Sequence, residues 1–105
     1  MPSEDVTFEL IIRQIEHNKT LWRFNVEVIE GTSRTVHEVT LSEADYKKLT
    51  RGKFSAKQAI ESAFQFLLEH EDKESIMSEF DVSVISRFFP EFPKEISKYL
   101  QKKKK

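Results

Sequence analysis

The feature that most constrains the fold is a period-two alternation of apolar and polar residues between residues 5 and 41. Two polar, turn-forming stretches, HNKT at 17–20 and EGTSR at 30–34, divide the alternation into three runs. The positions on one face are Val6, Phe8, Leu10 and Ile12 in the first run, Trp22, Phe24, Val26 and Val28 in the second, and Thr35, His37, Val39 and Leu41 in the third. Such alternation is typical of strands with one buried face, and short connections favour antiparallel pairing. The sequence therefore predicts a three-stranded antiparallel meander.

The first run is less regular than the other two. Ile11 and Ile15 lie on its opposite face, where polar residues are expected. We expect either that this strand is covered on both faces or that it contains a β-bulge near Arg13.

At Ser42 the spacing of apolar residues changes from strand-like to helical. Ser42 is followed three residues later by Asp45, which is typical of a helix start, and this helix should end near Thr50. Ser55 and Gln58 form a capping box for a second helix over about residues 56–70. Its apolar residues recur with helical spacing: Ala56, Ala59, Ile60, Ala63, Phe64, Leu67 and Leu68. We expect this main helix to pack against one face of the meander, which makes the fold α+β.

Shorter elements are expected in the C-terminal third of the chain. KESIMSEF at 73–80 predicts one or two helical turns, Asp81 begins a short helix that ends at Phe89, and Pro93 lies in the first turn of a last helix. An apolar cluster should close the core, namely Val82, Ile85, Phe88, Phe89 and Phe92. We predict a single domain over residues 1–101 and a disordered lysine tail over residues 102–105.

The stretch DVSVISR at 81–87 raises the alternative of a helix-turn-helix DNA reader. A recognition helix must be long enough to present several side chains to base edges, whereas this one meets Phe88, Phe89 and Pro90 almost at once. Without the four terminal lysines, 13 basic residues face 18 acidic ones, a net charge of −5. Nucleic acid is therefore a poor candidate for the main partner.

The chain resembles a family of small bacterial proteins without an assigned activity. The resemblance rests on HEVTLSEADYKKLTRG at 37–52 and on SIMSEFDVSVISRFFPEF at 75–92, and it covers about residues 24–96. In this family an antiparallel meander is followed by helices. The resemblance implies this fold and brings no activity, cofactor or site residue with it.

Residues that carry chemistry are scarce, and we expect neither an enzyme nor a bound cofactor or metal. The chain has no cysteine, only two glycines and therefore no glycine-rich phosphate loop. Its three histidines are spread along the sequence, and His37 is expected to be a half-buried, hydrogen-bonded residue of the sheet. The acidic start lacks the features of a signal peptide, and no apolar run is long enough for a membrane span. We expect a cytoplasmic protein that does not bind membranes.

The clearest charge feature is a group of five cations between Tyr46 and Ile60, where no acidic residue occurs. We call this group the basic patch: Lys47, Lys48, Arg51, Lys53 and Lys57. It surrounds the start of the main helix, and cations at a helix N-terminus attract anions. Tyr46 and Phe54 lie in the same stretch and would suit base stacking. The alternative is a solvated face that balances the acidic stretch at 69–81.

These observations predict a small non-enzymatic protein that binds an as yet unknown protein partner. A three-stranded sheet has two edges that must be protected or paired, so a homodimer formed through a sheet edge is compatible with the sequence. The alternative function is weak binding of an anion or a nucleic acid by the basic patch.

Overall fold

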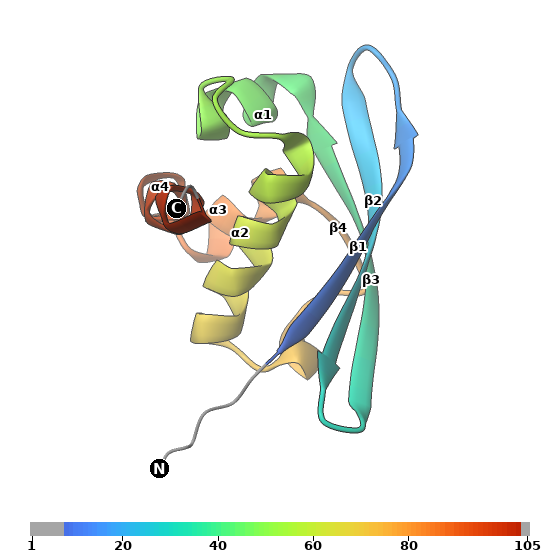
Figure 1. Cartoon of the computed structure of the whole chain (residues 1–105). Coiled ribbons are helices and arrows are strands. Elements are labelled where there is room, and N and C mark those ends of the chain that lie inside the picture. The colour runs from blue at the N-terminus through green and yellow to red at the C-terminus, as the bar shows by residue number, and fades with distance from the viewer. Residues whose placement is uncertain (1–7, 104–105) are drawn as a thin grey trace.

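The computed structural model of the protein describes residues 8–103 (Figure 1). The described part is an α+β fold, as predicted. Its strands are β1 (Glu9–His17), β2 (Leu21–Glu30), β3 (Ser33–Ser42) and β4 (Glu79–Asp81). Its α-helices are α1 (Glu43–Thr50), α2 (Ala56–His70), α3 (Ile85–Phe88) and α4 (Phe92–Lys103), and two 3₁₀ helices, η1 and η2, span Lys73–Ser75 and Val82–Val84.

The sheet has the strand order β1-β2-β3-β4. The first three strands form the predicted antiparallel meander, with Phe24 opposite Val39 in the register of β2 and β3. The fourth strand was not predicted: β4 pairs in parallel with β3, and its central residue Phe80 lies opposite Val39. Parallel strands require a long crossover connection, which α1 and α2 supply. The prediction of helical turns over 73–80 is correct for η1 and wrong for residues 79 and 80.

A β-bulge interrupts β1. This is the second of the two predicted alternatives, a bulge near Arg13 rather than a strand covered on both faces. The register with β2 shifts between Gln14 and Glu16, so Ile15 is the extra residue, two positions beyond Arg13. Its side chain is exposed. Of the two apolar residues expected on the outer face, Ile15 is therefore the one that has no partner in the ladder, whereas Ile11 pairs with Glu27.

Both predicted helix starts are present. The Ser42 hydroxyl accepts a hydrogen bond from the Asp45 amide at 3.0 Å. The Ser55 and Gln58 side chains form the reciprocal bonds of a capping box. These bonds satisfy amide groups that would otherwise lack partners at the helix N-terminus.

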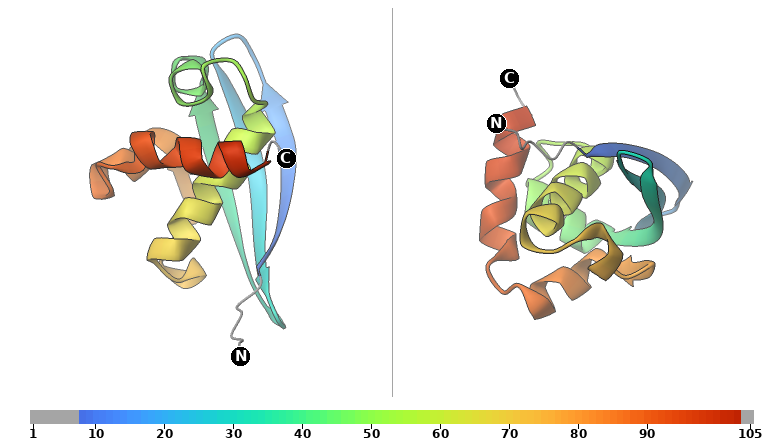
Figure 2. Two further views of the ribbon diagram at one scale, coloured as in Figure 1. Left: turned by 60° about the vertical axis from the view of Figure 1, so that its left-hand side comes forward. Right: turned by 90° about the horizontal axis from the view of Figure 1, so that it is seen from below.

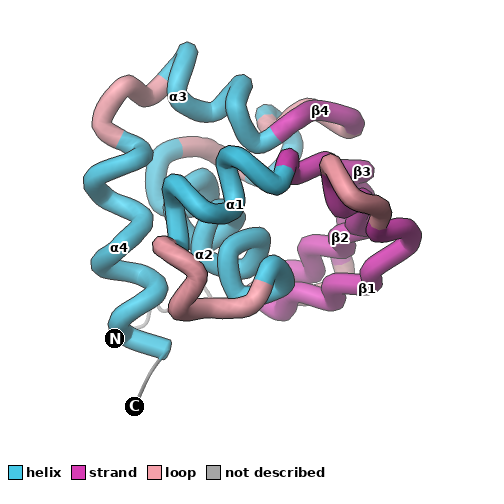
Figure 3. The backbone as a smooth tube through the Cα atoms, turned by 90° about the horizontal axis from the view of Figure 1, so that it is seen from above, coloured by secondary structure: helices cyan, strands magenta, loops and turns pink. Residues whose placement is uncertain are grey.

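The molecule has three layers, in the order sheet, α2 and α4 (Figures 2 and 3). Phe64 of α2 packs toward the sheet, with its ring 5.5 Å from that of His37 and 6.0 Å from that of Phe80. Phe66 packs toward α4, with its ring 5.1 Å from that of Phe92. The main helix is therefore buried on two sides, and Phe66 is the residue that gives it a second buried face.

The predicted C-terminal cluster is correct except at Phe88. Val82, Ile85 and Phe92 are buried and Phe89 is half-buried, whereas Phe88 is 67% exposed. The reason is that α3 is a single turn. The chain leaves the helix at Phe89, which turns back into the core and leaves the preceding ring outside. A helix of four residues is also too short to read a DNA groove, as predicted.

The predicted lysine tail begins inside a helix. Helix α4 continues through Lys103, so Lys102 and Lys103 are its last residues. Lys104 and Lys105 lie outside the described residues.

Candidate functional site

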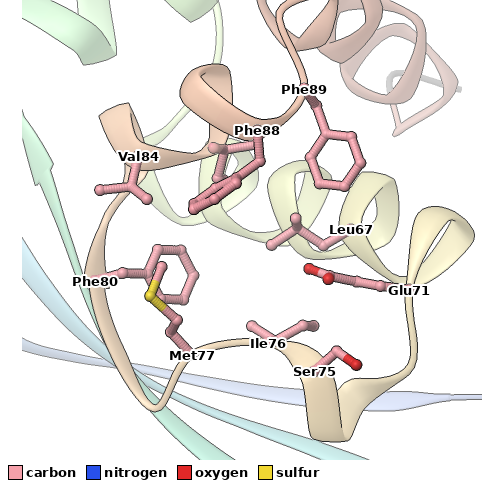
Figure 4. Close-up of a pocket in the computed structure, with 10 residues that line it drawn as sticks. Leu67, Glu71, Ser75, Ile76, Met77, Phe80, Val84, Phe88 and Phe89 are labelled. Atoms are coloured by element: carbon pink, nitrogen blue, oxygen red, sulfur yellow. The ribbon is translucent and has the colours of Figure 1, made fainter.

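An apolar pocket of about 240 Å³ opens between the end of α2, the loop before β4 and the single turn of α3 (Figure 4). We call it the Phe88 pocket. Eight of the ten residues that line it are apolar, namely Leu67, Ile76, Met77, Phe80, Val84, Ile85, Phe88 and Phe89. The two polar lining residues are Glu71 and Ser75.

The rim of the pocket exposes two large apolar side chains. Phe88 is 67% exposed and Met77 is 44% exposed. They project from α3 and from the opposite loop, so they flank the opening from two sides (Figure 4). Exposed apolar surface beside a concave, apolar hollow is typical of a surface that binds another molecule.

Buried His37 holds the loop that carries Met77. Its Nδ1 lies 2.7 Å from the carbonyl oxygen of Met77, and its Nε2 lies 2.8 Å from the hydroxyl of Thr35. A carbonyl oxygen only accepts hydrogen bonds, so Nδ1 must carry the proton. His37 is hydrogen-bonded, as predicted, but it is buried rather than half-buried, at 2% exposure.

A buried lysine ties the same loop to the end of β2. The Nζ of Lys73 donates to Glu30 Oε1 at 3.2 Å and to Glu74 Oε2 at 2.7 Å. The hydrogen bond with Glu74 raises the pKa of Lys73 above its ordinary 10.5, against the opposing effect of burial. The same bond lowers the pKa of Glu74 below 4.5. Both groups therefore remain charged at neutral pH. The ion pair between Lys73 and Glu30 ties this wall of the pocket to the end of β2.

Glu71 places a carboxylate in the pocket wall. Its side chain is directed into the hollow between Leu67 and Ile76 (Figure 4). Burial raises the pKa of Glu71 above its ordinary 4.5, while the nearby His70 opposes this shift. Among the described residues, no side-chain hydrogen bond or ion pair engages this carboxylate. A cation that entered the pocket would therefore meet a negative charge that is available to it.

The surroundings of the pocket are acidic. Residues 67–89, which supply every lining side chain, contain six acidic and two basic residues. One of the two bases, Lys73, is already paired with Glu30 and Glu74. The surface around the opening therefore favours positively charged partners.

The basic patch lies at the other end of α2 from the pocket. Lys47 and Lys48 are in the last turn of α1, and Arg51 follows that helix with a positive φ of 56°. Lys53 lies in the loop before α2, and Lys57 lies in the first turn of α2. All five side chains are exposed. Lys47 lies 3.9 Å from Glu43, and among the described residues the other four cations have no ion-pair partner.

The two aromatic residues near the basic patch are engaged in packing. The hydroxyl of Tyr46 donates to the carbonyl of Phe54 at 2.6 Å, and its ring lies 4.8 Å from that of Trp22. Tyr46 and Phe54 are both half-buried against the core. Part of each ring is therefore covered by its neighbours in the fold.

The described residues contain no cluster of three or more His, Asp or Glu side chains that could hold a metal ion. None of the helices in residues 8–103 combines the length and the apolar character needed to cross a membrane.

Sequence reasoning missed the Phe88 pocket because its lining comes from separate segments that only the tertiary fold brings together. The one sequence signal that could have indicated it is the surplus of phenylalanine late in the chain, at Phe80, Phe88, Phe89 and Phe92. No protein-family model, no curated protein and no solved structure matches this chain.

Proposed function

We propose that this protein is a non-enzymatic interaction module that binds an apolar, positively charged segment of a partner protein in the Phe88 pocket. The observation that carries the proposal is the exposed apolar rim, formed by Phe88 and Met77, above an apolar hollow. Burying such a rim against a partner gains about 25 cal/mol per Å² of apolar surface removed from water.

The size and the lining of the pocket favour a side chain over a cofactor. Ligand sites typically enclose about 300–1,000 Å³, and this pocket, at about 240 Å³, is smaller. Glu71 is the single ionisable group among its lining residues. General acid–base or nucleophilic catalysis usually needs at least two positioned groups, so the lining supports binding rather than chemistry.

The charge around the pocket defines the partner further. Glu71 faces the hollow, and the flanking segments are acidic. We therefore expect the bound segment to place a leucine, methionine or phenylalanine in the pocket and a lysine or arginine beside Glu71. The apolar anchor provides affinity, and the cation provides selectivity and faster association.

Two synthetic peptides test this proposal. Both carry the same phenylalanine and leucine anchors, and one has lysine flanks where the other has glutamate flanks. The chain has two methionines, Met1 and Met77, so methyl-labelled methionine gives one NMR reporter in the pocket. We expect the basic peptide to shift the Met77 methyl signal in a saturable way and the acidic peptide to bind at least about tenfold more weakly.

A pair of variants locates the binding. Phe88→Ala removes the rim side chain and should weaken binding of the basic peptide about tenfold, within the range found for interface aromatic residues. Val36→Ala is the control, because Val36 is also a large exposed apolar residue, at 49% exposure, but lies on β3. If neither peptide shifts Met77, or if both variants weaken binding equally, the proposal is wrong.

Anion binding by the basic patch is a second candidate function. It is favoured by one observation: Lys48, Arg51, Lys53 and Lys57 are exposed cations without an ion-pair partner among the described residues. The net charge of the rest of the chain opposes a polyanion, so we expect this binding to be weak.

A further inference from the structure

Strand β1 presents an edge that pairs with nothing in the described part of the chain. It is the outermost strand of the order β1-β2-β3-β4, and its ladder with β2 is regular from Glu9 to Gln14. The bulge at Ile15 ends this regular stretch. An unpaired edge of this length is a template for another strand.

The side chains of this stretch alternate between the two faces of the sheet. Leu10 and Ile12 lie on the helix-covered face, opposite Val28 and Val26, and both are only half-buried there. Glu9, Ile11 and Arg13 lie on the open face. The helix layer therefore leaves part of the apolar surface of β1 for a neighbouring strand to cover.

The order of residues on the open face is self-complementary. In an antiparallel pair of two β1 strands centred on Ile11, Glu9 of each copy lies opposite Arg13 of the other, and Ile11 lies opposite Ile11. On the helix-covered face of the same register, Leu10 lies opposite Ile12. Opposite charges and apolar residues that face each other across strands both stabilise pairing.

Neighbouring registers lack this complementarity. Centring the pair on Leu10 places Glu9 opposite Ile11, and centring it on Ile12 places Ile11 opposite Arg13. Centring it on Arg13 brings two arginines together, which is destabilising. The register centred on Ile11 therefore gives complementary pairs on both faces over residues 9–13, and the bulge lies just beyond them.

From this geometry we propose that two copies of the chain pair through β1 in the register centred on Ile11, forming a continuous eight-stranded sheet. The two-fold axis is perpendicular to the sheet, so both helix layers lie on the same face. Within β1 the paired stretch is five residues long on each side, residues 9–13, and interfaces this small are usually weak. The dimer should therefore form at high protein concentration and exchange rapidly with monomer.

Charge variants test the register directly. Glu9→Arg places two arginines opposite each other at both ends of the pair, and Arg13→Glu does the same with two glutamates. We expect each single variant to weaken the dimer at least about tenfold in sedimentation velocity over an about 100-fold range of concentrations at low salt. An equal mixture of the two single variants should form heterodimers, because every cross-strand charge pair is then opposite in sign.

Two further measurements separate pairing from other effects of the substitutions. Glu79→Arg makes the same charge change on β4, at the other edge of the sheet, and should leave the dimer unchanged. Arg13→Glu also loses the Arg13–Glu27 ion pair within one copy, but that loss persists in the mixture and cannot produce the restored dimer. A monomer at every concentration, or a mixture that stays monomeric, would overturn the proposal.

Discussion

Phe66 and Phe88 show how differently two residues of one type are used in this chain. Phe66 is fully buried, and its ring lies within 6.1 Å of the rings of Phe89, Phe92 and Tyr99. Phe88 is exposed at the rim of the pocket. The first ring joins two layers of the fold, whereas the second is available to a partner.

Alanine substitutions should separate these two roles. Phe66→Ala leaves a cavity between α2 and α4 and should lower the free energy of unfolding by about 3–5 kcal/mol. Phe88→Ala removes an exposed ring and should change it by no more than about 0.5 kcal/mol. Urea denaturation followed by circular dichroism measures both. Equal losses would mean that Phe88 is part of the core.

The Glu71 carboxylate should lower the free energy of unfolding at neutral pH, although we expect it to favour binding of a basic partner. Because burial raises its folded-state pKa above the ordinary 4.5, the protonated form stabilises the fold. That contribution is complete below pH 4.5 and is lost as the pH rises through the folded-state pKa. Glu71→Gln should therefore match the wild type at about pH 4 and be more stable at about pH 7.

The same variant should bind the basic peptide more weakly, because the charge in the pocket wall is gone. A matched variant is Glu79→Gln, which removes an exposed charge outside the pocket lining and should leave binding of the basic peptide unchanged. A Glu71→Gln variant that is less stable than the wild type at about pH 7 would show that the carboxylate is favourably paired.

At the scale of elements, the loop before β4 is held from both sides. Lys73 bonds to Glu30 at the end of β2, and His37 bonds to the carbonyl of Met77. The Glu38 amide also donates to the carbonyl of Ser78 at 2.8 Å. These bonds, more than the intrinsic preference of three residues, place β4 beside β3.

Removing the His37 donor should loosen this loop. His37→Leu replaces the imidazole with an apolar side chain and leaves the Met77 carbonyl without its hydrogen-bond donor, which costs about 1–3 kcal/mol. Relative to the wild type, hydrogen exchange in this variant should become faster in β4 and change less in β2, because β4 has only one neighbouring strand. Thr35→Val removes only the bond to Nε2 and should affect β4 less. Unchanged exchange in β4 would show that His37 does not position it.

On the scale of the whole molecule, charge is divided between the two ends of α2. The basic patch surrounds its N-terminus, and the acidic segment of the Phe88 pocket begins at its C-terminus. A helix of 15 residues separates these regions by about 22 Å, at 1.5 Å per residue. This exceeds the Debye length of about 8 Å at physiological salt, so each region should act separately.

Any nucleic-acid binding should therefore depend on the basic patch and on low salt. If about four cations contact duplex phosphates, log K should fall with log salt with a slope of roughly −3.6, from about 0.9 per contact. Fluorescence anisotropy with duplex oligonucleotides across a salt series measures the slope. A variant with both Lys48→Glu and Arg51→Glu should lose the binding, and binding that survives both the variant and high salt would place the site elsewhere.

The sequence by itself determined the elements whose signals are local. Alternating residues predicted β1, β2 and β3, because strand periodicity depends on neighbours two positions apart. Ser42 and Ser55 predicted the starts of α1 and α2, since a cap bonds amides only two or three residues away. The basic patch was equally visible, because its five cations are close in sequence.

Only the tertiary structure decided what depends on distant segments. β4 is a strand because the crossover brings Phe80 beside Val39, and its three residues are too few to show an alternation. Phe89 and Phe92 occupy the space beside Phe66, so the ring of Phe88 remains outside the core. The apolar pattern of the sequence cannot show which of several neighbouring rings faces the core. The Phe88 pocket combines the end of α2, a loop, β4 and α3, so its shape and its charge exist only once these four segments have packed together.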